Sequence, residues 1–320
     1  MKKVFALVLF CVFFASCDDG DLTVDTIDFS TVNAASCENL IYKVSSNEAL
    51  IIQLPTLQAA IINDPTLESA PRIFEINGTT TRVIYRSYDG TISGSSFCAS
   101  VPPANPVVQE EWTASSGTIE ISTFAVKTAN ANLEGGEKIT GYRHQIIFRN
   151  ITFDKPDGSQ LYEVFNFGNY NTTTPNLSFT FTAPADRCDS GRLYNWTSTE
   201  SIILDNFDNS LLANEVTPLD QPRTALLGTE SNILTFSVFG GGLSSSYFCA
   251  NPQPVTPEPI QVWSGAPGTP NVSGVIEVHT TTTSGGFIHE IHLRNATLRS
   301  GNSEFILADD FLFGTIITNN

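Results

Sequence analysis

The sequence predicts an all-β protein made of two tandem, homologous antiparallel β-sandwich domains, each with one intradomain disulfide. Three observations support this prediction. A long stretch of the chain recurs once, the cysteines recur with it, and short alternating segments separated by turn residues take the place of helical patterns. Each element found in the first copy can therefore be checked against the second.

The repeat is clearest where "SSFCASVPPANPVVQEEW" (95–112) returns as "SSYFCANPQPVTPEPIQVW" (245–263). A constant shift of 151 residues places Cys37 on Cys188, Asn63 on Asn214, Arg72 on Arg223, Cys98 on Cys249 and Trp112 on Trp263. This period matches a whole domain and is too long for a solenoid unit. We therefore divide the chain into a signal peptide (1–16), an acidic tether (17–25), a first sandwich (26–172) and a second sandwich (173–320).

Beyond the tryptophans the shift changes. "GTIEIST" (117–123) matches "GVIEVHT" (274–280), a shift of 157, whereas "YRHQIIFRNITF" (142–153) matches "FIHEIHLRNATL" (287–298), a shift of 145. The first copy therefore carries twelve extra residues between these segments, since 157 − 145 = 12. We expect a longer loop there, and we expect the two domains to differ functionally at it.

Within each copy the residues alternate with the period of two that is typical of strands, as in "TIEIST". The glycines of "TSGG" (283–286) predict a tight hairpin turn between two such strands. If the hairpin turns at these glycines, Glu277 lies opposite Arg294, and Glu120 lies opposite Arg149 in the first copy. We expect both pairs to be structural ion pairs. The one helical pattern, "TLQAAIIND" (56–64), predicts one or two turns.

The cysteines define the covalent framework. Of six, Cys11 lies in the signal segment and Cys17 is assigned below to a lipid, and the remaining four allow three connectivities. Only the pairing of Cys37 with Cys98 and of Cys188 with Cys249 keeps an equal spacing of 61 in both copies.

The domains resemble the immunoglobulin fold in architecture alone. Tyr247, two residues before Cys249, resembles the tyrosine corner of that fold, but the first copy has Ser96 in this place. In addition, Trp112 follows the second cysteine of its copy, whereas the immunoglobulin tryptophan lies between the two cysteines.

The N-terminus predicts export. Two lysines precede eleven apolar residues (4–14) and a small-residue stretch before Cys17, the pattern of a secretory signal. "FASC" (14–17) resembles the lipobox of bacterial lipoproteins, and the following "DDGD" resembles the surface-export signal of Bacteroidota lipoproteins. This resemblance implies lipidation of Cys17 and anchoring to the outer membrane, with the protein exposed at the cell surface. Secretion with cleavage nearby is the alternative.

The charge excludes some partners. The chain has a net charge of −17, and removal of Lys2 and Lys3 leaves 14 basic against 33 acidic residues, near −19. Nucleic acid requires a basic surface, so we exclude it as a partner. Docking on anionic lipid is disfavoured for the same reason, so the lipid on Cys17 would provide the membrane attachment.

No catalytic pattern is present. The sequence lacks G-x-S-x-G, H-E-x-x-H, C-x-x-C and a phosphate-binding glycine loop, so we predict no catalytic residues, metal or cofactor. His144 and His289 share a face with apolar residues, and we expect them to be hydrogen-bonded. His279 and His292 can pair across a hairpin, but they lack a third zinc ligand.

Trp112 and Trp263 are the candidate ligand-binding residues, because exposed aromatic rings stack on sugars and peptide side chains. Burial over the disulfide region is the favoured alternative. We expect a non-enzymatic lipoprotein, at the cell surface or facing the periplasm, that binds a glycan or a protein ligand. Glycan capture resembles the tandem-domain, starch-binding surface lipoproteins of polysaccharide-uptake systems. Adhesion or assembly, as in fimbrillin-like lipoproteins, is the alternative, and a hydrolytic enzyme is the least favoured.

Overall fold

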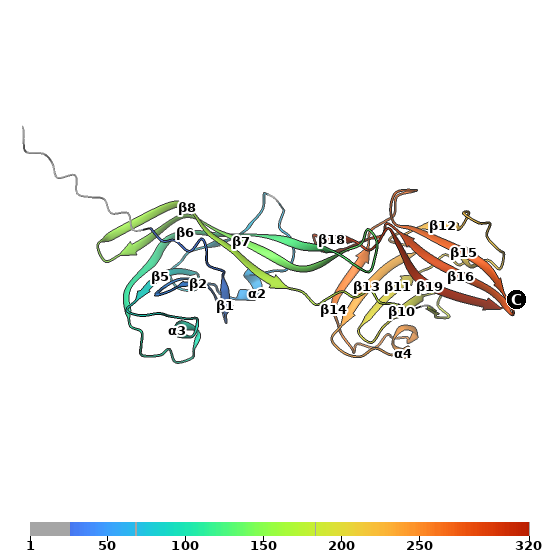
Figure 1. The fold of residues 1–320 in the computed structure, drawn as a ribbon, viewed down its shortest axis with the longest axis horizontal. Coiled ribbons are helices and arrows are strands. Elements are labelled where there is room, and N and C mark those ends of the chain that lie inside the picture. Colours follow the sequence, from blue (N-terminus) through green and yellow to red (C-terminus); the bar gives the residue numbers. More distant parts are fainter. Residues whose placement is uncertain (1–25, 68, 183, 320) are drawn as a thin grey trace, which may run out of the picture.

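The computed structural model describes residues 26–319 except 68 and 183. The protein is all-β, with two antiparallel β-sandwich domains following one another along the chain (Figure 1). This confirms the predicted fold class. Cys17, which was predicted to carry a lipid, and the predicted acidic tether lie outside the described residues. None of the described helices is long and apolar enough to cross a membrane.

The first domain is one hydrogen-bonded sheet folded over on itself. Its order is β1-β2-β3-β5-β6-β7-β8, and β4 pairs with β6. The strands β6, β7 and β8 are long and run through both layers: β5 pairs with residues 108–113 of β6, and β4 pairs with residues 118–121. The elements are β1 (Ala35–Cys37), β2 (Leu40–Ser45), β3 (Glu48–Gln53), α2 (Leu57–Ala60), β4 (Arg72–Glu75), β5 (Arg82–Tyr88), α3 (Ser95–Cys98), β6 (Val108–Ala129), β7 (Glu137–Lys155) and β8 (Gly158–Thr173).

In the second domain the counterparts of these long strands are broken, so the two layers are separate sheets of order β18-β17-β14-β13-β11-β10-β9 and β12-β15-β16-β19. The break between β14 and β15 coincides with the register change after Trp263 in the sequence. The elements are β9 (Asp186–Arg187), β10 (Leu193–Trp196), β11 (Glu200–Asp205), η2 (Asn209–Leu212), β12 (Arg223–Leu226), β13 (Ile233–Phe239), α4 (Ser246–Cys249), β14 (Pro259–Gly265), β15 (Val275–Thr283), β16 (Gly286–Arg294), β17 (Thr297–Ser300), β18 (Ser303–Ile306) and β19 (Asp310–Asn319).

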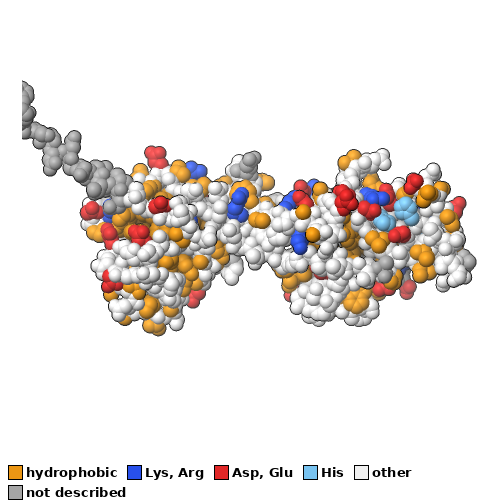
Figure 2. Space-filling view, viewed as in Figure 1, with side chains coloured by type: hydrophobic (Ala, Val, Ile, Leu, Met, Phe, Trp, Pro, Cys, Tyr) orange, Lys and Arg blue, Asp and Glu red, His pale blue; other side chains and the backbone are white. Residues whose placement is uncertain are grey.

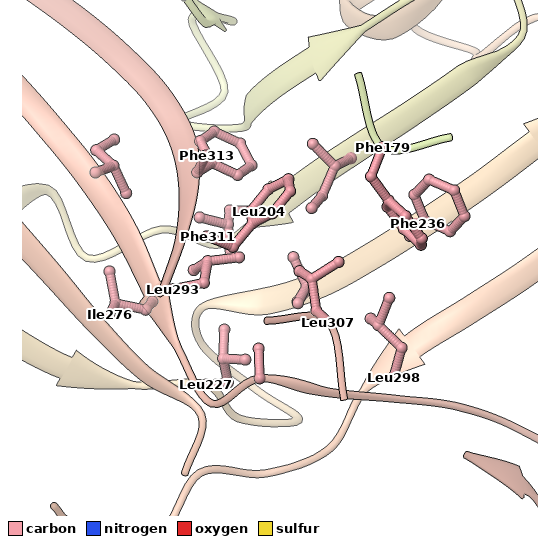
Figure 3. Close-up of a cluster of buried hydrophobic side chains, with 14 of the residues drawn as sticks. Phe179, Leu204, Leu227, Phe236, Ile276, Leu293, Leu298, Leu307, Phe311 and Phe313 are labelled. Carbon is pink, nitrogen blue, oxygen red and sulfur yellow. The ribbon is translucent and has the colours of Figure 1, made fainter. Parts of the chain in front are cut away.

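The core of each domain lies between its layers. In the second domain Leu204 and Phe236 of the seven-stranded sheet face Leu293 and Phe313 of the four-stranded sheet, and all four are buried (Figure 3). Burying side chains of this size stabilises by roughly 1.5–3 kcal/mol each. The alternating pattern of the strands produces this arrangement, because every second residue points into the space between the sheets.

Each disulfide fastens a one-turn helix over the outer face of one sheet. The predicted pairs are confirmed: Cys37 is bonded to Cys98 and Cys188 to Cys249, with a sequence separation of 61 in both domains. In the second domain, Cys188 belongs to a small cluster with Tyr194 and Phe248 that is separate from the main core.

The first domain reaches the second through the hairpin formed by β6 and β7 (Figure 1). The twelve extra residues were expected to form a loop. Instead they lengthen both strands, and only residues 130–136 form the turn. Ile139 and Tyr142 of β7 are buried in the main core cluster of the second domain. Tyr142 Oη lies 2.9 Å from Ser303 Oγ. We call residues 124–141 the bracing hairpin.

The tip of the bracing hairpin makes backbone contact with the second domain. The Asp309 amide donates to the Glu134 carbonyl oxygen at 2.9 Å. Beside the hairpin, the loop after α2 also crosses between domains, since the Asn302 amide donates to Asp64 Oδ1 at 2.7 Å. The two domains are therefore joined at several points, and a narrower waist separates them (Figure 2).

Candidate functional site

A buried chain of polar side chains crosses the first domain beside the waist. Arg72 Nη1 donates to Thr123 Oγ1 at 2.7 Å, and this oxygen lies 2.9 Å from His144 Nδ1. His144 Nε2 lies 3.2 Å from Thr172 Oγ1, which donates to Asn63 Oδ1 at 2.7 Å. Thr123 and His144 are fully buried. The chain connects β4, β6, β7 and β8 to the loop that follows α2.

Donor chemistry gives this chain a direction. A guanidinium group can only donate, so Thr123 Oγ1 accepts from Arg72, which leaves its own hydroxyl hydrogen for Nδ1 of His144. In that arrangement the imidazole is the Nε2–H tautomer, which donates to Thr172. Burial and, to a smaller extent, the charge of Arg72 lower the pKa of His144 to about 4. The histidine is therefore neutral at pH 7, as this direction requires.

The second domain contains the same chain. Arg223 donates to Thr280, which contacts His289 Nδ1, and His289 Nε2 contacts Thr318, each at 2.9 Å. Thr318 in turn donates to Asn214 Oδ1 at 2.5 Å. Burial, followed by the charge of Arg223, lowers the pKa of His289. Both histidines are hydrogen-bonded on an apolar face, as expected from the sequence.

The chain holds the loop after α2 in place. Arg72 also donates from Nη2 to the Asp64 carbonyl oxygen at 2.7 Å, and the Asp64 side chain binds Asn302 of the second domain. The loop residue Asn63 is exposed, and its Nδ2 makes no hydrogen bond within the described residues. Asn214 differs, because its Nδ2 donates to the Asn319 carbonyl oxygen.

Both expected Glu–Arg ion pairs are present, but the predicted register is wrong. Arg149 Nε lies 3.0 Å from Glu120 Oε2, and Arg294 Nε lies 2.7 Å from Glu277 Oε2. Glu277 is directly opposite His292, because Thr283 pairs with Gly286 and the hairpin turns one residue earlier than its two glycines suggested. The pairs are therefore diagonal contacts, which long side chains can span.

Neither tryptophan presents the exposed ring on which the expectation of ligand stacking depends, and burial, the favoured alternative, is what the structure shows. Trp112 is 3% exposed and Trp263 is 4% exposed, so neither offers a free ring face. They do not pack over the disulfides either. Trp112 packs on Tyr85 in the main core, with ring centroids 4.6 Å apart, and Trp263 packs edge-on against Phe305. Large apolar side chains on the inner face of a sheet are taken up by the core.

The histidines of the second domain do not converge. The rings of His279 and His292 are 5.8 Å apart, and His292 Nδ1 lies 2.7 Å from Asp310 Oδ1. His289 is buried in the polar chain described above. No group of three side chains suited to a metal ion occurs in the described parts of the chain.

Several hollows among the described residues have the size of a ligand site. One of about 490 Å³ is formed by the tip of the bracing hairpin (129–137), and three others lie on the second domain and at the waist. The largest, about 690 Å³, lies on the outer face of the disulfide-bearing sheet and includes Arg192, Phe239 and Val255. A second, of about 480 Å³, borders Arg294 and Asp309. The third also measures about 480 Å³ and is the only one of these three that both domains form. We call this third hollow the interdomain groove.

The interdomain groove is lined by uncharged residues. Asn63 and Tyr142 come from the first domain, Thr173, Thr174 and Pro175 from the connection, and Ile260, Gln261, Val262, Trp263 and Ser300 from the second domain. Burial raises the pKa of Tyr142, so its phenol stays neutral. No local sequence pattern predicts this groove, because its lining residues are far apart in the chain. The matched Asn63/Asn214 pair was the one available signal.

Comparison with known proteins returned no match: no protein-family model, curated protein or solved structure matches this chain.

Proposed function

We propose that this chain is a lipid-anchored protein of the cell envelope that binds a ligand without catalysing a reaction, and that the interdomain groove is its binding site. One observation carries the proposal. Ile139 of the bracing hairpin and the adjacent Tyr142 are buried in the core of the second domain, so the two walls of the groove are held in one arrangement. A preorganised groove binds without the cost of ordering its walls.

The chemistry of the lining supports binding over catalysis. Amides, hydroxyls and apolar side chains line the groove, with no carboxylate, imidazole or thiol among them. General acid–base chemistry depends on groups of that kind. The two buried histidines are fully engaged in hydrogen bonds.

Export and anchoring through Cys17 form the second part of the proposal. The two disulfides support it, because such bonds persist in oxidising compartments outside the cytosol. Mass spectrometry of the N-terminal peptide tests this part: we expect a lipid on Cys17, and an unmodified chain beginning elsewhere would contradict it.

Two filling variants test the binding site. Ile260 is 56% exposed in the interdomain groove, and Val255 is 86% exposed beside the larger outer hollow. The full-length chain, purified in detergent, is screened against arrayed oligosaccharides and peptides. We expect Ile260→Trp to abolish the binding that the screen detects and Val255→Trp to leave it intact.

The opposite result would move the site to the outer hollow. A chain that binds nothing on either array, yet sediments as filaments, would replace the proposed binding function with assembly.

A further inference from the structure

Two amide groups in the interdomain groove have their carbonyl oxygens occupied from inside the protein. Asn63 Oδ1 accepts from Thr172 at 2.7 Å, and Gln261 Oε1 accepts from Trp263 Nε1 at 3.4 Å. Both residues line the groove. Neither amide nitrogen has a hydrogen-bond partner within the described residues.

A donor from inside the protein sets the orientation of each amide. For Asn63 the donor is the Thr172 hydroxyl, the member of the polar chain that contacts this loop. For Gln261 it is the indole N–H of Trp263, which has no acceptor atom. A flipped amide would place N–H against N–H or O–H, so in both residues the NH₂ group is left for a ligand.

The groove is also neutral where its counterpart in the repeat is charged. The shift of 151 residues places Gln261 on Glu110 and Val262 on Glu111, and Glu111 forms an ion pair with Arg86. In a chain with a net charge of −17, an acidic ligand would meet repulsion at long range and no cation in the groove. A neutral ligand avoids both penalties.

A peptide strand fits this groove less well. β14 has an unpaired edge before Ser264, because β17 pairs only with Ser264 and Gly265. That edge is short and begins at Pro259, which has no N–H to donate to an added strand.

Resting on the proposed function, we infer that the interdomain groove binds a neutral, hydroxyl-rich ligand, an uncharged saccharide. The amide nitrogens of Asn63 and Gln261 donate to its oxygens, and Ile260, Val262 and Pro175 provide apolar contact for its C–H faces. The volume of about 480 Å³ lies within the range of small-ligand sites. Sugars combine oxygen acceptors with apolar faces, and this combination matches the lining.

The repeat supplies matched controls for the test. Asn63→Ala removes the groove amide, and Asn214→Ala removes the equivalent amide at the far end of the second domain, so both leave one threonine without its acceptor. Likewise, Gln261→Ala and Glu110→Ala each remove the acceptor of a tryptophan N–H. The controls remove the same acceptors but lie outside the groove, and Asn214→Ala also removes the bond to the Asn319 carbonyl oxygen, so its structural cost is at least as large.

The full-length chain in detergent is tested on an array of neutral glucans, mannans, galactans and xylans, together with uronate-containing and sulfated oligosaccharides and peptides. We expect neutral saccharides to bind, Asn63→Ala and Gln261→Ala each to weaken binding about tenfold, and both controls to bind within about twofold of the parent chain.

Unchanged binding in both groove variants would overturn the inference. So would ligands that are exclusively acidic saccharides or peptides, even if Ile260→Trp still blocked them; in that case the proposed binding function would stand and the saccharide assignment would fall.

Discussion

Gly136 lies against the carbonyl oxygen of Leu307, so close that a Cβ at position 136 would stand 2.5 Å from that oxygen. The two residues belong to different domains. Backbone-to-backbone approach of this kind requires glycine, because any side chain would push the elements apart.

Gly136→Ala should therefore loosen the attachment of the bracing hairpin. We expect a loss of about 1–3 kcal/mol in the free energy of unfolding, typical of an overpacked contact, and a longer maximum dimension in small-angle scattering. Gly285→Ala is the control, because a Cβ there meets nothing within 4 Å at the tip of the corresponding hairpin of the second domain. Equal effects from the two variants would mean that the hairpin tip does not hold the domains together.

The stability of the protein should fall as the pH decreases from about 6.5 to about 4. The pKa of His144 is lowered to about 4 from an ordinary 6.5, so the unfolded chain binds the proton first and stability is lost across this interval. The loss from this residue is at most about 3 kcal/mol. His289 contributes in the same direction.

Urea unfolding measured near pH 7 and near pH 5 checks this dependence, because most carboxylates stay ionised over that range. His144→Gln keeps a donor and an acceptor but does not titrate. It should therefore reduce the change in the free energy of unfolding between these two pH values. If the pH dependence of the free energy of unfolding were unchanged in this variant, folding would not lower the pKa of His144.

Each disulfide should stabilise its own domain. Replacing Cys188 and Cys249 by serine should destabilise the second domain by roughly 4 kcal/mol, since the bond closes a long loop of the unfolded chain. Differential scanning calorimetry should show one transition moving to lower temperature and the other keeping its position. Coordinated loss of both transitions would mean that the domains unfold as a unit.

Trp112→Ala should reduce stability without removing a ligand contact. The side chain is buried against Tyr85, and truncating a buried tryptophan costs about 3–5 kcal/mol. Trp112→Phe should cost less, because it keeps most of the apolar volume. A stable Trp112→Ala variant that had lost all binding would reinstate the ring as a ligand contact.

The sequence was most informative where the repeat doubled the signal. The equal spacing of the cysteines in the two copies was enough to predict both disulfides. Alternation predicted strands, but a hairpin register depends on turn conformation, and the turn at Ser284 and Gly285 shifted Glu277 from Arg294 to His292. A shift of one residue in the turn changes every pairing in the hairpin.

The candidate site was much harder to predict from the sequence than the fold. His144, between apolar neighbours on one strand face, was identified as hydrogen-bonded, but the other members of its hydrogen-bond chain come from four other segments of the sequence. The groove needed more still, since it exists only because residues 124–141 attach one domain to the other. No local pattern reports that Asn63 and Gln261 line one groove, 198 positions apart (261 − 63 = 198).

The bracing hairpin makes the two domains unequal, because only the first domain has one. The first domain packs its bracing hairpin against the second domain. The equivalent hairpin of the second domain ends at a two-residue turn, Ser284 and Gly285, and has no such extension. Duplication of the first domain would add another interdomain contact of the same kind, with a groove beside it. Duplication of the second domain would add a unit without such an extended hairpin between the copies.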